Sequence, residues 1–301
     1  MLDFTSAIAV FTGFLTIFGI GLPIITPSTK QATTLIPQMQ IMLDSSYTAK
    51  SILIANIADD SHLAERAIND IRPIASLTKI MTGLLAIEIL SPNTPIIMSK
   101  DAVSTPGDLA DFQAGEVVIM RDALYALMMP SSNHIAMAIA ETVGDRLGGK
   151  TFDEKIERFV HMMNERARFL NMKDTIYRNP TGLDLKNNEP SNLSSANDIL
   201  KLLRFSLNTP ILWEPSRESQ KIVTSFGQRR HVFTNRNPLT PYIVNLIGTK
   251  TGTTKASGEN IIIIYEEILG TPQAIIILGA QPGQRVIEAE SLLIKTGGMV
   301  Q

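Results

Sequence analysis

The sequence predicts one mixed α/β domain of the α+β kind, in which helices pack on an antiparallel sheet. Two strand-like segments, residues 49–57 and 62–67, form an early hairpin ahead of the helices. Three more strand-like segments follow the helices near the end of the chain, and two of them contain four-residue runs rich in isoleucine. Such runs are typical of central strands that are covered on both faces.

The predicted helices are recognised by the spacing of their apolar residues. Residues 76–90 are apolar almost throughout, which indicates a buried helix, whereas residues 152–170 alternate charged and apolar side chains, as on an exposed amphipathic helix. The other predicted helices are 121–129, 134–143 and 196–205, and residues 288–293 begin a closing helix. The late strands are 242–248, 259–267 and 273–280.

The N-terminal segment of residues 7–25 carries no charged side chain. Its roughly 19 residues, at ~1.5 Å each, approach the ~30 Å thickness of the hydrocarbon layer of a membrane. No Lys or Arg precedes it, and Thr-Pro-Ser-Thr-Lys follows it in place of Ala-x-Ala, so an uncleaved anchor fits better than a signal peptide. We expect a transmembrane anchor or signal segment at 1–25, a linker at 26–46 and a globular domain at 47–301.

The overall composition excludes several functions. The 301 residues include 27 Lys and Arg against 29 Asp and Glu, for a net charge of −2, so no basic surface for nucleic acid is indicated. The chain has no cysteine, which excludes disulfides, thiolate catalysis and cysteine metal sites. Nucleophilic chemistry in this chain therefore falls to serine and lysine.

Ser76 and Lys79 are the first candidate catalytic pair, and no other Ser-x-x-Lys occurs in the sequence. They open the predicted apolar helix, where residues three apart lie on one face with Cβ atoms ~5–6 Å apart. A lysine amine that is neutral can take the serine proton, and burial beside a second cation lowers a lysine pKa. The N-terminus of a helix also offers N–H groups to a developing oxyanion. The alternative is an N-cap serine followed by a surface lysine.

Lys250-Thr251-Gly252 is the second candidate, next to predicted strands. A lysine on a strand beside hydroxyl groups can hold a substrate carboxylate, and glycine allows a substrate backbone to lie close. The same triplet recurs at 295–297, beyond the last strand, where we interpret it as chance.

Ser131-x-Asn133 is the third candidate, on a short loop after Pro130 between two helices. A serine hydroxyl there can relay a proton, and an asparagine amide can hold a substrate amide. Ser-x-Asn also occurs at residues 91, 195 and 206, where it trails or flanks a helix. Only the copy at 131 lies on a helix-to-helix loop between the other two motifs.

The three motifs in this order resemble those of the penicillin-recognising serine enzymes, the β-lactamases and penicillin-binding proteins. The residues around Ser76, at 73–82, resemble the nucleophile segment of the low-molecular-mass D-alanyl-D-alanine carboxypeptidases. Later segments of that family are similar to Asn-Pro-Thr-Gly-Leu-Asp at 179–184, Leu-Ser-Ser-Ala at 193–196 and Gly-Thr-Lys-Thr-Gly-Thr-Thr at 248–254. The resemblance extends from about residue 49 to about residue 297.

This resemblance implies the β-lactamase/transpeptidase-like fold, a helical cluster packed on a five-stranded antiparallel sheet with the active site between them. It implies a serine D,D-peptidase that removes the terminal D-alanine from peptidoglycan stem peptides ending in D-Ala-D-Ala, through an acyl-enzyme. Such an enzyme is acylated by β-lactams and needs no metal or other cofactor. With the N-terminal segment as a membrane tether, it implies a location at the bacterial cell membrane, with the catalytic domain on the extracytoplasmic side. The charge balance of the chain indicates no nucleic-acid partner.

The family also implies roles for residues that match its motifs. Ser76 would be the nucleophile, Lys79 its general base, and Ser131 would pass a proton to the leaving amine. The N–H groups of Ser76 and Thr253 would form the oxyanion hole. The implied substrate-binding residues are Asn133, Lys250, Thr251, Gly252, Thr253 and Arg285, of which Arg285 matches an arginine near the substrate carboxylate.

Three positions differ from the family pattern. His134 stands where the family usually has aspartate, Asn197 stands where it has arginine, and Ser257 replaces an alanine before Gly258. These residues lie beside the motifs and not within them. They therefore bear on rate and substrate preference more than on the type of reaction.

Four other functions are weighed against this one. A class A β-lactamase needs Glu-x-x-Leu-Asn, which this chain lacks: the segment from Glu189 inverts Leu-Asn, and residues 167–171 begin with alanine. No Gly-x-Ser-x-Gly segment supports a Ser-His-Asp hydrolase. His62-x-x-Glu65 would make a poor zinc site, because residues three apart on a strand point to opposite faces. An inactive wall-binding homologue would not need the intact motifs.

Overall fold

The computed structural model describes residues 40–267 and 270–299, which belong to one compact unit. The expected membrane segment at 7–25 and most of the expected linker lie outside the described residues. Within the described ranges, no helix is both long and apolar enough to cross a membrane.

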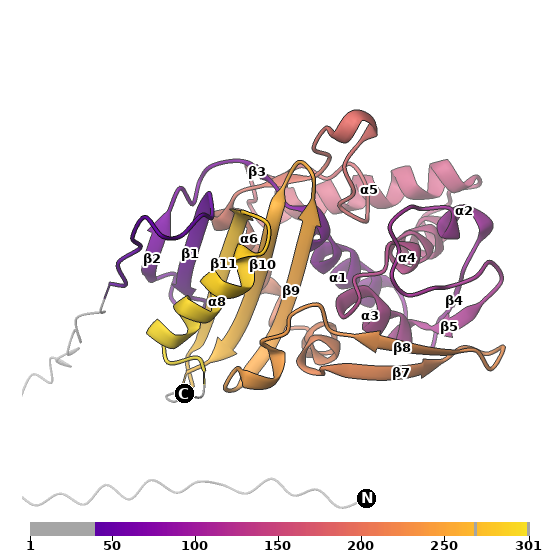
Figure 1. Cartoon of the computed structure of the whole chain (residues 1–301). Helices are drawn as coiled ribbons and strands as arrows, with labels where there is room; N and C mark the ends of the chain where they lie inside the picture. The colour runs from indigo at the N-terminus through magenta and orange to yellow at the C-terminus, as the bar shows by residue number, and fades with distance from the viewer. Residues whose placement is uncertain (1–39, 268–269, 300–301) are drawn as a thin grey trace, which may run out of the picture. The chain divides into compact units, whose positions relative to one another are not determined.

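A five-stranded antiparallel sheet forms one half of the domain (Figure 1). Its strand order is β2-β1-β11-β10-β9, so the early hairpin pairs with the last strand of the chain. The bounds are β1 Ser51–Asn56, β2 His62–Arg66, β9 Leu246–Thr254, β10 Gly258–Glu266 and β11 Pro272–Ala280. The predicted fold class, with its five-stranded antiparallel sheet, is confirmed.

The isoleucine runs are buried on both faces of this sheet, as predicted. Ile262 and Ile264 of β10 pack into the core beneath the helical half of the domain. Ile261 and Ile263, which alternate with them, pack into a second core beneath the closing helix α8, Gln284–Lys295. The period of two along a strand therefore divides one run between two cores.

The helical half packs against the other face of the sheet (Figure 1). The predicted helices are confirmed with ends that agree within a few residues. Their bounds are η1 Ala75–Thr78 continued by α1 Lys79–Ile89, α3 Met120–Met128, α4 Asn133–Arg146, α5 Phe152–Phe169 and α6 Ala196–Ser206. Shorter helices are α2 Lys100–Val103, η2 Lys186–Asn188, α7 Pro210–Trp213, η3 Glu214–Arg217 and η4 Thr240–Tyr242.

The strand predicted at 242–248 is misplaced. Residues 240–242 form η4, and β9 begins at Leu246 and continues to Thr254, so Lys250 lies within a strand and not after one. Pro241, directly before the predicted segment, lies in the first turn of η4 and cannot donate a ladder hydrogen bond. Three short strand pairs are not predicted from the sequence: β3 Arg72–Pro73 with β6 Leu193–Ser194, β4 Pro95–Ile97 with β5 Val117–Ile119, and β7 Gln220–Thr224 with β8 Arg230–Thr234.

The expectation that His62 and Glu65 point to opposite faces is wrong. His62 Nδ1 lies 2.9 Å from Glu65 Oε2. The register of β1 with β2 shifts here, since Ile54 faces Ala64 while Ala55 faces His62. A bulge of this kind inserts one extra residue and brings the side chains on either side of it to one face. In the described part of the chain, no group of three or more His, Cys, Asp or Glu residues is arranged to hold a metal.

Candidate active site

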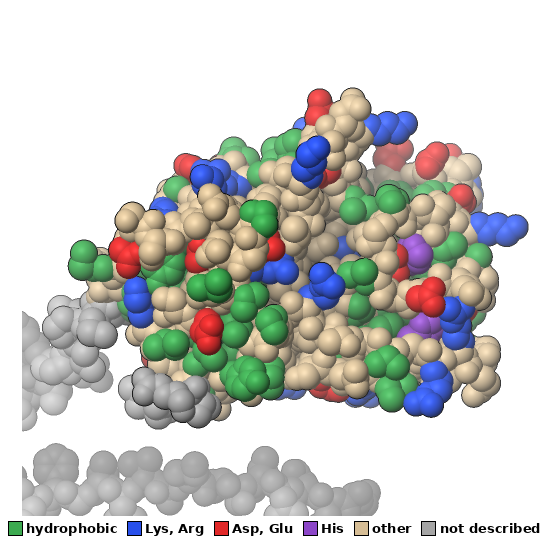
Figure 2. Space-filling view, viewed as in Figure 1, with side chains coloured by type: hydrophobic (Ala, Val, Ile, Leu, Met, Phe, Trp, Pro, Cys, Tyr) green, Lys and Arg blue, Asp and Glu red, His purple; other side chains and the backbone are tan. Residues whose placement is uncertain are grey.

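A cavity of about 240 Å³ lies between β9 and the helical half of the domain. Figure 2 shows the surface hollowed there, with Lys and Arg side chains at its edge. All three sequence motifs contribute to it. The lining residues are Ser76, Gly107, Leu109, Pro130, Ser131, Asn133, Leu183, Arg236, Thr251, Gly252, Thr253, Thr254 and Arg285.

Ser76 and Lys79 meet at the start of α1, as their spacing predicts. The chain enters through Ala75, whose φ of +47° turns it sharply into the 3₁₀ turn η1 that carries Ser76. Lys79 begins α1 and is fully buried, and its Nζ lies 2.9 Å from Ser76 Oγ. The same Nζ donates hydrogen bonds of 2.8 Å to Asn133 Oδ1 and to the Thr181 carbonyl.

Burial lowers the pKa of Lys79 to about 7, against an opposing effect of the Asp108 carboxylate, which raises it. A neutral amine keeps two N–H groups and one lone pair. The carbonyl oxygens of Asn133 and Thr181 can only accept, so they take the two N–H groups. The hydroxyl of Ser76 can donate, so the lone pair of the Lys79 amine faces the proton of that hydroxyl. This arrangement suits proton transfer from the serine to the lysine.

The Ser131–Asn133 segment connects α3 to α4. Ser131 has a φ of +67°, an unfavourable conformation for a non-glycine residue, and the fold holds it there. Ser132 caps α4 by accepting a hydrogen bond of 3.1 Å from the Ile135 N–H. The Asn133 amide donates to the Pro106 carbonyl at 2.9 Å while its oxygen accepts from Lys79. Asn133 therefore ties the nucleophile helix to the loop before residue 108.

Lys250 faces the same segment from β9. Its Nζ donates to Ser131 Oγ at 2.9 Å and to the Thr251 carbonyl at 2.8 Å. Burial holds the pKa of Lys250 well below its ordinary value, and the nearby cations Lys79, Arg285 and Arg236 act in the same direction. Ser131 thus lies against one buried lysine, and Ser76 against another.

Glycine at two positions lets the backbone approach the nucleophile. A Cβ on Gly252 would lie 2.9 Å from the Ser76 backbone nitrogen. A Cβ on Gly182, which has a φ of +83°, would lie 1.9 Å from the Ala75 carbonyl oxygen. Real Cβ atoms do not approach backbone atoms so closely, so both segments need glycine to pack on η1. Because β9 is the edge strand of the sheet, its groups not paired with β10 face the cavity.

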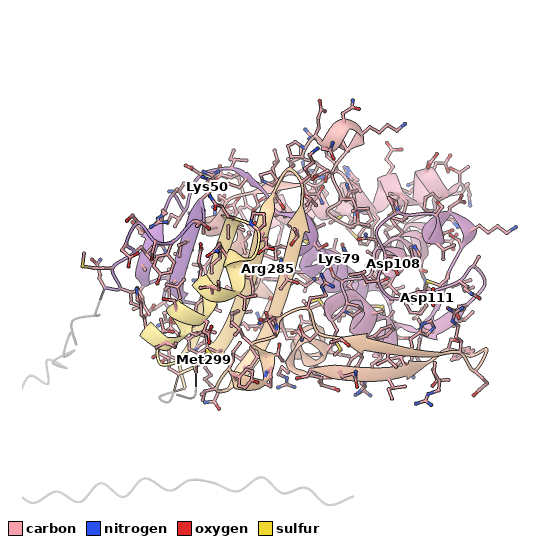
Figure 3. All side chains as sticks on the ribbon, viewed as in Figure 1. Lys50, Lys79, Asp108, Asp111, Arg285 and Met299 are labelled. Atoms are coloured by element: carbon pink, nitrogen blue, oxygen red, sulfur yellow. The ribbon has the colours of Figure 1, made fainter. Side chains whose placement is uncertain are left out.

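Thr253 and Arg285 close one end of the cavity. Arg285, on α8, donates to Thr253 Oγ1 at 2.6 Å and to the Gly252 carbonyl at 3.3 Å. Figure 3 shows Lys79 and Asp108 on the helical side of β9 and Arg285 on the side of α8. The structure therefore brings together all nine residues selected from the sequence. The cavity is cationic, and among the described residues that line it none is Asp or Glu.

Three residues of this region are not predicted from the sequence. Asp108 accepts hydrogen bonds from Ser132 Oγ at 2.6 Å, the His134 N–H at 2.9 Å and the Ala110 N–H at 2.8 Å. Thr181 supplies a carbonyl to Lys79, and Arg236 lines the cavity. Asp108 and Arg236 lie in irregular segments, where no periodic pattern could have indicated them. Thr181 belongs to segment 179–184, which resembles a family segment, but its carbonyl contact with Lys79 was not predicted.

The three departures from the family pattern have structural partners. His134 Nε2 lies 3.0 Å from the Thr105 carbonyl oxygen, and its Nδ1 lies 3.5 Å from Asp108. Ser257 Oγ accepts from the Thr254 N–H at 3.0 Å and so holds the turn between β9 and β10. Asn197 donates to the Asn69 side chain at 3.1 Å and does not line the cavity. Glu189, considered for a β-lactamase, is exposed and also lies outside the lining.

Comparison with known proteins agrees with the geometry. A family model described as D-alanyl-D-alanine carboxypeptidase matches residues 38–281. The chain belongs to this family. It is accordingly a hydrolase, a peptidase of the D-alanyl-D-alanine carboxypeptidase family.

Two curated relatives carry different names. A D-alanyl-D-alanine endopeptidase of Pseudomonas aeruginosa is 28% identical over 255 residues, which cover 81% of this chain and 75% of that protein. The D-alanyl-D-alanine carboxypeptidase DacD of Escherichia coli is 31% identical over 236 residues, 73% of this chain and 55% of DacD. Among solved structures, a Streptomyces DD-transpeptidase matches with a TM-score of 0.75 at 20% identity, over 85% of this chain and 99% of that one, which shows the shared fold.

Proposed function

We propose that the protein is a serine-type D-Ala-D-Ala carboxypeptidase that removes the terminal D-alanine from peptidoglycan pentapeptides. The observation that carries the proposal is the contact between the buried Lys79 amine and Ser76 Oγ, at 2.9 Å. A neutral amine at this distance can take the hydroxyl proton as Ser76 attacks the carbonyl of the penultimate D-alanine.

The remaining residues have roles that follow from their positions. The N–H groups of Ser76 and Thr253 stabilise the negative charge on the carbonyl oxygen. Ser131, held by Lys250, passes a proton to the departing amine and regains the one that Lys79 took from Ser76, and the carbon–nitrogen bond breaks to leave an ester on Ser76. Asn133 holds the substrate amide. Water then cleaves the ester and restores the Ser76 hydroxyl.

The terminal carboxylate of the substrate binds at the cationic end of the cavity. Lys250, Thr251 and Arg285 surround this end, and Arg285 is aligned by its hydrogen bond to Thr253. Charge-assisted hydrogen bonds of this kind favour a peptide that ends in a carboxylate over one that does not. The carboxylate of a penicillin binds in the same place, with Ser76 attacking the β-lactam carbonyl to form a covalent adduct.

Mass spectrometry of the penicillin-treated protein tests the proposal. We expect a covalent adduct on Ser76 in the wild type and no adduct in Ser76→Ala. Free D-alanine released from a pentapeptide, together with slow turnover of penicillin, identifies a carboxypeptidase. A wild-type protein that is never acylated would contradict the enzyme function, and fast penicillin turnover would indicate a β-lactamase.

We also propose that residues 7–25 tether this domain to the extracytoplasmic side of the bacterial cell membrane. The support is an uncharged stretch of roughly 19 residues, close to the length that spans a bilayer. The full chain should remain in the membrane pellet after an alkaline carbonate wash, and a chain that begins at residue 47 should not. Release of the full chain by the wash would contradict the tether.

A further inference from the structure

The segment that precedes β1 runs along one face of the closing helix α8, which lies across β10 and β11 (Figure 1). The Tyr47 hydroxyl lies 2.9 Å from Ser291 Oγ, and the Lys295 ammonium lies 5.0 Å from the centre of the Tyr47 ring. Glu288 is one helical turn before Ser291, and residues three and four apart on a helix share a face. Residues 47–49 therefore form a strap along this face of α8.

Glu288 is a buried carboxylate whose partners come from the strap. Its side chain belongs to a residue that is only 4% exposed. Its Oε1 accepts hydrogen bonds from the Thr48 N–H at 2.5 Å and the Thr48 hydroxyl at 2.6 Å, and its Oε2 accepts from the Ala49 N–H at 3.2 Å. A buried charge is strongly destabilising unless it is hydrogen-bonded. These contacts therefore fix the strap and α8 to each other.

Thr48 also holds the turn that leads into α8. Its hydroxyl oxygen accepts a hydrogen bond of 3.0 Å from the Gln281 N–H, while its hydroxyl hydrogen is donated to Glu288. Gln281 precedes Arg285 by four residues, and Glu288 follows Arg285 by three. One threonine side chain thus fixes the chain on both sides of Arg285.

The first turn of α8 has little other support. Its N-cap residue, Gly283, has a φ of +80° and provides no side-chain cap. Ile287 in this turn is 58% exposed, and Val286 packs against the second core but is only partly buried. The buried residues of α8 begin with Glu288. The turn that carries Arg285 therefore depends on Thr48 and Glu288 more than on apolar packing.

The exact position of Arg285 matters for binding an anion in the catalytic cavity. Its Nη1 is used by Thr253 and by the Gly252 carbonyl, whereas its buried Nε has no hydrogen-bond partner among the residues that the structure describes. The guanidinium therefore retains hydrogen-bonding capacity for a carboxylate. Because hydrogen bonds weaken steeply when they are misaligned, this binding depends on how α8 holds Arg285.

We propose that Thr48 and Glu288 are positioning residues, which align Arg285 with the carboxylate-binding end of the cavity. The inference rests on the proposed function, which places the terminal carboxylate of the substrate there. Loosening the strap allows the first turn of α8 to shift and so weakens carboxylate binding. The contacts between Ser76 and Lys79 are unaffected, because their described partners lie in neither the strap nor α8.

The test uses two thioester substrates with the same acyl peptide. The departing thiol carries a carboxylate in one, a thioglycolate, and a neutral amide in the other, and thioesters are reactive enough for both rates to be measured. The wild type should prefer the carboxylate. In Glu288→Gln the amide nitrogen cannot accept from the strap. It should lower kcat/KM for the carboxylate thioester about tenfold, mainly through KM, and change the amide thioester less than about twofold.

Three further variants complete the test. Thr48→Val, which lacks the hydroxyl, should give the same selective loss, and Thr48→Ser, which keeps it, should behave as the wild type. Glu290→Gln is the matched control, because Glu290 lies on α8 and is exposed. We expect it to leave both rates unchanged.

The outcomes separate this inference from the proposed function. Equal losses on both thioesters would mean that the strap serves only stability, and would overturn the inference. Unchanged kinetics in both Glu288→Gln and Thr48→Val, or a wild type without preference for the carboxylate, would also overturn it. A wild-type protein that neither thioester acylates at Ser76 would overturn the proposed function instead.

Discussion

Asp108 accepts a hydrogen bond of 2.6 Å from the hydroxyl of Ser132, the residue between the two functional members of the Ser131–Asn133 segment. The same carboxylate oxygen accepts from the His134 N–H at 2.9 Å. The Asp108 side chain is only 4% exposed and therefore acts as a buried support for this segment. Its charge also raises the pKa of Lys79, in opposition to burial. One residue outside the motifs thus positions the segment and adjusts the base.

Asp108→Asn removes this charge with almost no change of shape. We expect the acylation rate to fall about tenfold, because the amide nitrogen of asparagine cannot accept from the Ala110 N–H. The pKa of Lys79 should also decrease, so the acidic limb of the rate profile should shift to lower pH. Asp111→Asn is the control, since Asp111 is 87% exposed and pairs with Arg229 at the surface (Figure 3). An equal loss of acylation rate and an equal shift of the pH profile in both variants would exclude a positioning role for Asp108.

Lys79→Arg should lower acylation by about 10³-fold, because a guanidinium does not deprotonate to act as a base. The rate is measured with a fluorescent penicillin, and circular dichroism checks that the variant is folded. Lys255→Arg serves as the control, since Lys255 is exposed in the turn after β9. Near-normal acylation in Lys79→Arg would mean that another group takes the Ser76 proton.

The pH profile of the wild type tests the same assignment without mutation. Below a pKa of about 7 the Lys79 amine is protonated and has no lone pair for the Ser76 proton. The second-order acylation rate should therefore rise with pH and reach half of its plateau near pH 7. A rate that stays constant between about pH 6 and 8 would contradict Lys79 as the base.

Ser131→Ala should separate attack on the carbonyl from departure of the amine. An amine must gain a proton to leave, whereas a thiolate leaves without one. We expect a loss of about 10²-fold with a peptide substrate and a much smaller loss with a thioester analogue of it. Alanine at this position keeps the same backbone constraint as serine, so the comparison reports on the hydroxyl. Equal losses on both substrates would indicate that Ser131 acts only in binding.

Gly252→Ala should impair the oxyanion hole through a steric effect. The new Cβ would lie 2.9 Å from the Ser76 nitrogen, which forces β9 away from the nucleophile. We expect acylation to decrease about 10²-fold, the cost of losing one oxyanion donor. Gly227→Ala is the matched control, because a Cβ there meets no atom within 4 Å. Unchanged acylation in Gly252→Ala would show that β9 can shift without loss of the site.

Much of the fold follows from local patterns. The isoleucine runs predict strands buried on both faces, and β10 and β11 have that environment. The predicted and observed helix ends agree closely where a capping residue is present, as at Thr151 before α5. The strand predicted at 242–248 and the bulge in β2 do not follow from local patterns. Both depend on how a strand pairs with its neighbours, which the sequence of one segment does not specify. Proline changes this pairing in the first case, and an extra residue changes it in the second.

By itself the sequence determined the contact of Ser76 with Lys79, because residues three apart in a helical turn share a face whatever surrounds them. Only the tertiary structure decided the rest of the site. Ser131 and Lys250 are 119 residues apart, and their hydrogen bond depends on how the loop between α3 and α4 lies beside β9. The complete burial of Lys79, which lowers its pKa, likewise comes from distant segments around Asn133 and Thr181. Spacing along the chain fixes contacts within one helical turn, whereas burial and charge at the site depend on which distant segments pack around it.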